Sequence, residues 1–258
     1  MEVLRLSFVQ EDLFWEDKQK NLNYFDQKLT TLKEVTDLVI LPEMFTTGFS
    51  MQAKELAETM DGTTVQWLRK QAARLSSAIM GSCIIVEGDN YYNRLLFVTP
   101  EGNIHHYDKR HLFSFAGEHH HYTAGKDRLL IDYQGWKIMP LICYDLRFPV
   151  WSRNTDYYDL LIYVANFPDK RRFAWEQLLT ARAIENQAYT VGVNRIGKDG
   201  KGIEYSGNSQ CIDYSGWMLS DAESKSIVKT IELSYSAQQS FRRQFAFLPD
   251  RDMFEIKS

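Results

Sequence analysis

A cysteine stands at the end of an apolar run, directly before charged residues. In LICYDLRFP, residues 141–149, Cys143 follows Met-Pro-Leu-Ile and precedes Tyr-Asp-Leu-Arg. A cysteine that only fills a core belongs inside the apolar run, whereas a turn after a strand would present the thiol to solvent. Because a thiolate is a strong nucleophile, we predict a nucleophilic role for Cys143. A small buried hydrophobic residue is the alternative.

Two other apolar runs also end in a polar residue. Glu43 follows VILP, and Asn166 follows LIYVA. Ligands of α/β proteins bind at the carboxyl ends of the strands, so we expect Glu43, Cys143 and Asn166 to converge on one site. A carboxylate within hydrogen-bond reach of a thiol can take its proton. Glu43 on its own is equally compatible with a solvated residue after a strand.

A long segment with little periodicity, HYDKRHLFSFAGEHHHYTAG, covers residues 106–125. Loops of this length inside a compact domain are functional or disordered, and the aromatic residues argue against disorder. Lys109 would place an ammonium group where it can stabilise a thiolate or an oxyanion. The run His119 to His121 lacks a second cluster of carboxylates or thiols at ligand spacing, so we interpret it as a solvated turn and expect no metal ion.

The bulk composition narrows the class of protein. The 258 residues are 44% hydrophobic and 25% charged, as in ordinary globular proteins. A net charge of −4 provides no basic surface, so we expect no nucleic-acid partner. Three scattered cysteines are too few for a disulfide framework. The first residues, MEVLRLSFVQ, do not read as a signal peptide, and no apolar run approaches a membrane span. We therefore expect a cytoplasmic protein with no membrane contact.

Apolar spacing predicts short strands that alternate with amphipathic helices, followed by hairpin-like pairs. We expect strands within residues 3–9, 37–43, 78–87, 93–99, 129–133, 137–142, 159–168, 189–193, 206–213 and 227–233, and helices at 17–35, 65–76, 173–186 and from 234 onward. No linker, charge block or repeat divides this series. We predict one α/β domain, residues 1–258, whose sheets are covered by helices on their outer faces.

Three segments, LPEMF, YDKRHLF and LICYDLRFPVWSRN, resemble the catalytic signatures of the nitrilase superfamily of carbon–nitrogen hydrolases, in the same order. Residues 175–197 are similar to the segment that follows the nucleophile in that family. LPE alone is a weak signal, but the three in order are specific, and the resemblance extends from the first strand to about Leu233. Within the superfamily, the segments YDKRHLF…EHHHY and CYDLRFPVWSRN most resemble those of bacterial omega-amidases. These enzymes hydrolyse the terminal amide of 2-oxo acids such as 2-oxoglutaramate.

The resemblance implies a role for five residues. Cys143 would be the nucleophile that becomes an acyl-thioester, Glu43 the general base, and Lys109 the cation that stabilises the tetrahedral intermediate. The backbone N–H of Tyr144 would complete the oxyanion hole. Glu118 falls where family members often carry a second glutamate that orients the site.

The resemblance also implies an architecture and an assembly. The family fold is a four-layer α-β-β-α sandwich, and its members usually pair into homodimers. Aromatic residues in 148–151 and 241–250 are candidates for such an interface, with packing in their own core as the alternative. The implied ligand is a small amide, with no cofactor.

The segment FPDKRRFAW, residues 167–175, could hold the far end of a substrate. An omega-amidase must bind a carboxylate a few carbons from the nucleophile, and an arginine can clamp one with two hydrogen bonds. We predict Arg172 for this role, with Asn166 and Phe167 as further substrate contacts. A solvated helix entrance is the alternative. We also expect Arg147 and Asp145 to fasten the nucleophile turn by ion pairing, with substrate contact as the alternative.

Other functions remain as alternatives. Metal-dependent phosphoesterases with a similar sandwich need Gly-Asp-x-Asn and Ser-Asp-His stretches, which this sequence lacks. A non-enzymatic relative would be expected to lose one of the three central residues. Another amidase of the superfamily, a carbamoyl-amide hydrolase or a nitrilase is the principal alternative.

Overall fold

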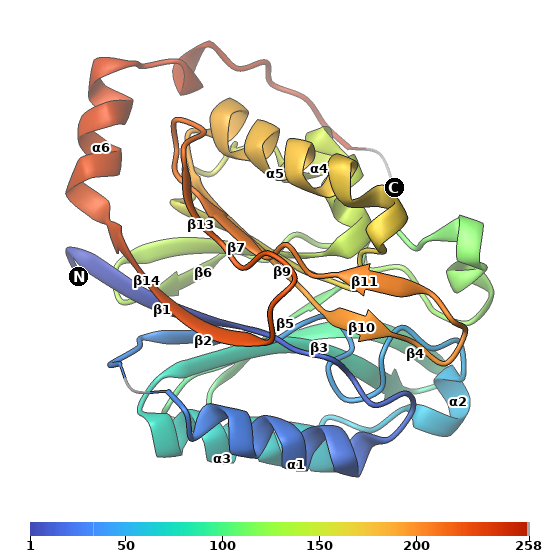
Figure 1. Ribbon diagram of the computed structural model, residues 1–258. Helices are drawn as coiled ribbons and strands as arrows, with labels where there is room; N and C mark the ends of the chain where they lie inside the picture. Colours follow the sequence, from blue (N-terminus) through green and yellow to red (C-terminus); the bar gives the residue numbers. More distant parts are fainter. Residues whose placement is uncertain (33, 257–258) are drawn as a thin grey trace.

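Two six-stranded mixed sheets lie face to face between outer helices (Figure 1). The computed structural model describes residues 1–32 and 34–256. Helices α1 (Lys18–Leu29) and α3 (Thr63–Leu75) cover the outer face of one sheet, and α4 (Pro149–Ser152) and α5 (Arg172–Asn186) cover the other. The expected four-layer α-β-β-α sandwich is therefore confirmed.

The first sheet contains the N-terminal strands and is completed by a strand from near the end of the chain. Its order is β14-β1-β2-β3-β4-β5, and only the pairs β1–β2 and β2–β3 are parallel. The strands are β1 (Val3–Gln10), β2 (Leu38–Ile40), β3 (Ala78–Glu87), β4 (Asn90–Val98), β5 (Ile104–Asp108) and β14 (Ile227–Ser234). The short helix α2 (Ala53–Leu56) lies between β2 and α3 in the chain.

The second sheet repeats this plan. Its order is β13-β12-β9-β8-β7-β6, with β7, β8 and β9 parallel in the middle. The strands are β6 (Ile131–Tyr133), β7 (Trp136–Ile142), β8 (Leu160–Ala165), β9 (Tyr189–Asn194), β12 (Gln210–Ile212) and β13 (Met218–Asp221). A separate hairpin, β10 (Ile196–Lys198) and β11 (Glu204–Ser206), follows β9, and α6 (Tyr235–Gln244) follows β14.

The middle strands are buried on both faces. Every residue of Leu38–Ile40 and of Leu160–Ala165 is inaccessible to solvent, as expected for parallel strands enclosed on both sides. One apolar cluster fills the space between the sheets and under α5, and a second lies between the first sheet and its helices. This packing fixes the strand ends, and the residues that follow them, in space.

The first helix is shorter than its apolar spacing predicts. It ends at Leu29 instead of residue 35, and the hydroxyl groups of Thr30 and Thr31 donate to the carbonyl oxygens of Gln27 and Lys28. Such bonds compete with the continuation of a helix. Val35, expected on the apolar face, is 74% exposed.

Several short elements were not expected from the sequence. The strand β5 covers the first residues of the segment 106–125, and the expected strand at 206–213 is divided between β11 and β12.

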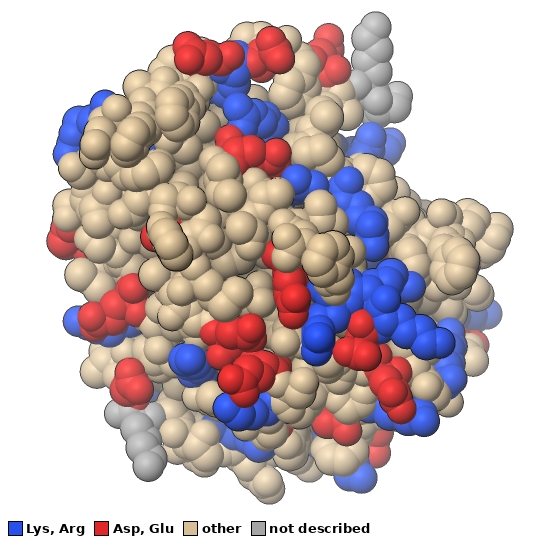
Figure 2. All heavy atoms as spheres, turned by 45° about the horizontal axis from the view of Figure 1, so that its top comes forward, with Lys and Arg blue, Asp and Glu red and all other residues tan. Residues whose placement is uncertain are grey.

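Among the described residues, no helix is long and apolar enough to cross a membrane. Figure 2 shows acidic and basic residues side by side on one face, with Lys and Arg denser toward the right of the view.

Candidate active site

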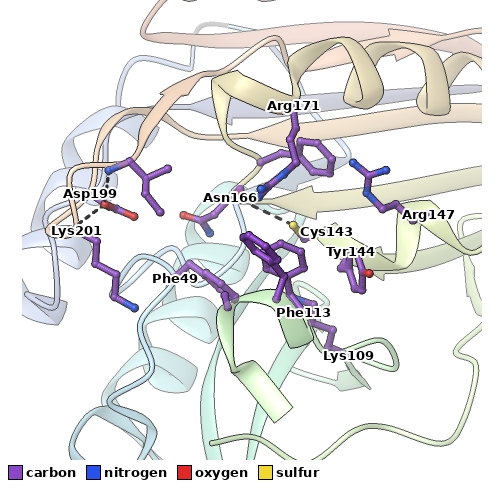
Figure 3. A pocket seen from close by; sticks show the side chains of 14 residues that line it. Phe49, Lys109, Phe113, Cys143, Tyr144, Arg147, Asn166, Arg171, Asp199 and Lys201 are labelled. Carbon is purple, nitrogen blue, oxygen red and sulfur yellow. Dashed lines mark hydrogen bonds between the residues drawn. The ribbon is translucent and has the colours of Figure 1, made fainter. Parts of the chain in front are cut away.

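Polar residues that follow strands of both sheets meet in one pocket. Cys143 directly follows β7 and Asn166 directly follows β8, while Glu43 comes three residues after β2 of the opposite sheet. A cavity of about 290 Å³ opens over Cys143 and Asn166, and Figure 3 shows its lining. The structure brings Glu43, Cys143 and Asn166 together: the backbone N–H of Asn166 donates to Glu43, and the thiol of Cys143 contacts the carbonyl oxygen of Asn166.

The carboxylate of Glu43 is fully buried and is held by donors from both sheets. Its Oε1 accepts hydrogen bonds from Nζ of Lys109 at 2.9 Å and from Nδ2 of Asn93 at 2.8 Å. Its Oε2 accepts a bond from the backbone N–H of Asn166 at 2.8 Å, and Nδ2 of Asn166 donates to the Glu43 carbonyl at 2.6 Å. A buried carboxylate needs such partners, and here they fix its orientation.

Lys109 follows β5 and is 1% exposed. Besides its bond to Glu43, its Nζ donates to both carboxylate oxygens of Glu118 at 3.0 Å. Burial by itself would lower the pKa of Lys109, but the carboxylates of Glu118 and Glu43 outweigh it and hold this pKa above the ordinary lysine value. Because its pKa is raised, the Lys109 ammonium is charged throughout the neutral range. Burial also raises the pKa of Glu118, although Lys109 opposes this shift.

Cys143 begins a 3-10 turn, Cys143–Arg147, in a left-handed backbone conformation with φ of 44°. This conformation is uncommon for a residue with a side chain, and it turns the chain sharply at the end of β7. The thiol lies 3.9 Å from the carbonyl oxygen of Asn166. Burial, followed by the Glu43 carboxylate, raises the pKa of Cys143 well above the ordinary thiol value. The resting thiol is therefore protonated, and a base must remove its proton before it can attack.

Asp145 fastens this turn, but not through the predicted ion pair with Arg147. Its buried carboxylate accepts bonds from the N–H of Ile142 at 3.0 Å, from the hydroxyl of Tyr107 at 2.8 Å, and from the N–H of His111 at 3.0 Å. Nδ1 of His111 lies 2.8 Å from the same carboxylate. Arg147 is exposed and lines the pocket. The ion-pair prediction is wrong because Ile142, Tyr107 and His111 already occupy the Asp145 carboxylate.

The outer wall of the pocket is aromatic and cationic. Its cations are Arg147, Arg171 and Lys201, and among the described residues none of the three pairs with an acidic side chain. The aromatic lining residues are Phe49, Phe113, Phe115, Tyr144 and Phe167. The wall therefore joins an apolar surface to a net positive charge.

Among the predicted substrate contacts, Asn166 and Phe167 line the pocket and Arg172 does not. Arg172 is the first residue of α5 and is half exposed, with Nε 3.6 Å from Glu176 one helical turn later. Arg171 reaches the pocket instead, because it precedes the helix. The helical rotation between adjacent residues separates the directions of the two side chains, and this difference could not be read from three consecutive cations.

The histidine run forms an exposed 3-10 turn, and the rings of His119 and His120 lie 3.8 Å apart. In the described part of the chain, no group of three or more His, Cys, Asp or Glu residues is arranged to hold a metal ion. The interpretation as a solvated turn is confirmed by this exposure.

Two residues of the site were missed by sequence reasoning. Asn93 lies inside β4, donates to Glu43, and its carbonyl accepts the backbone N–H of Lys109 at 3.0 Å. In the sequence it stands between Tyr92 and Arg94, where nothing distinguishes it from a polar surface residue of a strand. Lys201 lies in the turn of the β10–β11 hairpin, far in sequence from Cys143, and the fold brings it to the pocket. Its sequence, KDGKG, reads as an ordinary turn.

Known proteins resemble the chain over nearly its whole length. Residues 5–243 match the family model described as carbon-nitrogen hydrolase. The chain is 48% identical to an omega-amidase of Yersinia enterocolitica over 98% of its own length and 99% of that protein. It is 32% identical to a 2-oxoglutaramate amidase of Bacillus subtilis, covering 90% of this chain and 92% of the relative.

A solved structure resembles the whole chain. A carbon–nitrogen hydrolase superfamily protein of Xanthomonas campestris, with an arsenic adduct in its active site, is 44% identical and superposes with a TM-score of 0.97 over 100% of both chains. The match of sequence and fold over nearly the full length leads to one conclusion. The chain belongs to the carbon–nitrogen hydrolase family, the nitrilase superfamily.

Proposed function

We propose that the protein is an omega-amidase that hydrolyses the terminal amide of 2-oxoglutaramate, or of the shorter 2-oxosuccinamate, to the 2-oxo acid and ammonia. One observation carries this proposal: the partly buried Cys143 and the buried Glu43 and Lys109 lie beside a short pocket whose wall bears three cations that pair with no acidic side chain of the described residues. The cysteine, glutamate and lysine suit amide hydrolysis. The cations on the wall suit a substrate with a carboxylate at its far end. Relatives named as omega-amidase and 2-oxoglutaramate amidase give the same substrate class.

In the first half-reaction Cys143 attacks the amide carbon. Glu43 takes the thiol proton as the carbon–sulfur bond forms, and then delivers this proton to the amide nitrogen. The carbon–nitrogen bond breaks, ammonia leaves, and an acyl-thioester remains. The raised pKa of Cys143 supports this order, because the thiol does not ionise until a base removes its proton.

Lys109 and the N–H of Tyr144 stabilise the oxyanion in this proposal. Tyr144 is the second residue of the 3-10 turn, and the first N–H groups of a helix lack intrahelical partners. Glu118 and Glu43 together hold the Lys109 ammonium in place. Donors fixed before the reaction need no reorganisation as charge develops.

Water completes the cycle. Glu43 removes a proton from a water molecule, the resulting hydroxide attacks the thioester carbon, and the carbon–sulfur bond breaks. The departing sulfur regains its proton from Glu43, so the enzyme returns to its starting state.

Ammonia release from a panel of substrates tests the proposal. The panel contains 2-oxoglutaramate, succinamate, pentanamide, a carbamoyl amide and a short nitrile. We expect kcat/KM for 2-oxoglutaramate to exceed that for pentanamide by at least about 100-fold, because a charged contact contributes about 1.5–3 kcal/mol and the 2-oxo group adds to it. A preference for the neutral amide, the carbamoyl amide or the nitrile would contradict the assignment.

We further propose that the protein is a homodimer. Val150, Phe247 and Phe254 are 53%, 62% and 41% exposed, and they border one cleft together with Pro149 and Arg251. Exposed apolar side chains gathered around one cleft, with charged residues beside them, suit a protein interface. Light scattering should give twice the mass of the chain at micromolar concentration, and Phe247→Asp should reduce it to the mass of one chain. A monomer in the unmodified protein would contradict this assembly.

A further inference from the structure

The structure assigns the recognition of the substrate carboxylate to Arg171. This inference rests on the proposed function and identifies the residue that selects an anionic over a neutral amide. Arg171 ends a 3-10 turn, Asp169–Arg171, directly before α5. It lines the pocket and is partly buried, and its guanidinium donates to no other described residue.

Aromatic rings hold this guanidinium in place. Its central carbon lies 4.9 Å from the ring centre of Phe113 and 5.9 Å from that of Phe167. Stacking on aromatic faces orients the planar fork of an arginine and leaves its N–H edge free. A positioned arginine loses little conformational freedom when a carboxylate binds, so the site is prepared for a bidentate contact.

The position of Arg171 suits a substrate only a few carbons long. Figure 3 shows its side chain reaching from the start of α5 toward Cys143, while Lys201 lies beyond Asn166 on the opposite side. The central guanidinium carbon of Arg147 lies 5.8 Å from the ring centre of Phe167, so Arg147 adds positive charge, but it is more exposed than Arg171. Of the three cations, Arg171 combines partial burial, aromatic support and direction toward the thiol.

The hairpin cation is less suited to the role. Lys201 is exposed in the turn between β10 and β11, next to Asp199. The Asp199 carboxylate accepts the N–H groups of Lys201 and Ile203 at 2.9 Å, so its negative charge remains close to the lysine. This neighbour reduces the field of Lys201 inside the pocket.

Arg171→Gln and Arg172→Gln are a matched pair of tests. Both remove one positive charge at adjacent positions, but only Arg171 lines the pocket. We expect Arg171→Gln to lower kcat/KM for 2-oxoglutaramate about 10- to 100-fold, mainly through KM, the usual loss for a hydrogen bond to a charged group. Turnover of pentanamide should stay within about twofold of the unmodified enzyme. Arg172→Gln should leave both substrates unchanged, and Arg171→Lys should recover part of the loss.

A binding measurement separates this inference from the proposed function. Iodoacetamide should alkylate the partly exposed Cys143 in preference to the buried Cys83 and Cys211, and 2-oxoglutarate should protect the thiol. In Arg171→Gln, half-protection should need about 10- to 100-fold more 2-oxoglutarate. Equal protection in both proteins, equal losses on the anionic and neutral amides, or a larger effect of Arg147→Gln would overturn the assignment of Arg171. Failure of the unmodified enzyme to hydrolyse 2-oxoglutaramate, with protection still dependent on Arg171, would overturn the proposed function alone.

Discussion

The floor and the outer wall of the pocket are constructed in opposite ways. On the floor, Glu43, Lys109 and Glu118 are at most 1% exposed, and each is bonded to another member of the group. On the wall, Arg147 and Lys201 are exposed and Phe115 is 87% exposed. The floor residues follow buried strands or bond to residues that do, whereas the wall residues lie in turns and loops.

This difference separates the reaction from the choice of substrate. Buried groups that satisfy one another cannot be changed singly without leaving an unpaired charge. Exposed residues on turns can change at small cost in stability. We therefore expect substitutions on the floor to abolish the chemistry for every amide, and substitutions on the wall to alter the preference among amides.

The largest effect is expected for the nucleophile. Cys143→Ala should lower kcat for every amide by more than about 1000-fold, because no covalent intermediate can form. The far-ultraviolet circular dichroism should be unchanged. Cys83→Ala is the control, since this buried thiol lies in β3 away from the pocket, and its activity should be normal. Retained turnover in Cys143→Ala would exclude covalent catalysis by this residue.

A large loss is also expected for Lys109→Arg, about 100-fold or more in kcat. The charge remains, but the space between Glu43 and Glu118 fits a compact ammonium and not a planar fork. Lys109→Ala should be only slightly worse. The exposed Lys126, on the same loop, provides Lys126→Arg as the control. Near-normal rates in Lys109→Arg would place Lys109 outside the oxyanion site.

Glu43→Gln should stop turnover and should also change the pH dependence of Cys143 alkylation. The Glu43 carboxylate contributes to the raised pKa of Cys143, so its removal lowers this pKa. The rate of Cys143 alkylation by iodoacetamide should therefore rise at lower pH in the variant than in the unmodified enzyme. A midpoint that stays constant or moves upward would show that Glu43 does not act on the thiol in the resting state.

The smallest effect is expected for Lys201→Gln on the wall. Its charge is exposed, so kcat/KM for 2-oxoglutaramate should fall less than about fivefold, and the difference should disappear at high salt. Pentanamide should be unaffected. Lys198→Gln, on the same hairpin and paired with Glu204 at 3.8 Å, is the matched control. A salt-independent loss as large as that of Arg171→Gln would transfer the main anion contact to Lys201.

The same contrast explains what could be predicted from the sequence. Glu43, Cys143 and Asn166 each follow an apolar run, and strand ends are visible in a sequence because burial requires apolar side chains. The four-layer fold followed from the family signatures. Only part of the wall could be predicted: Phe167 lines the pocket as expected. The choice between Arg171 and Arg172 could not be made, because they differ only in where a helix begins, and helix boundaries are poorly specified by local sequence. Asn93 was missed because its role is to donate a hydrogen bond to Glu43, which lies in a distant part of the chain.

The pairing of β14 with β1 has a consequence for the synthesis of the protein. The two strands pair along their whole length, from Val3 opposite Ser234 to Gln10 opposite Ile227. During translation β1 is made before the other strands of this sheet, and β14 is made after them. Until β14 has emerged, a nascent chain therefore carries an open sheet edge, a known site of aggregation. The first sheet, which positions Glu43 and Lys109, is complete only when residues 227–234 have emerged, so we expect activity to require this strand.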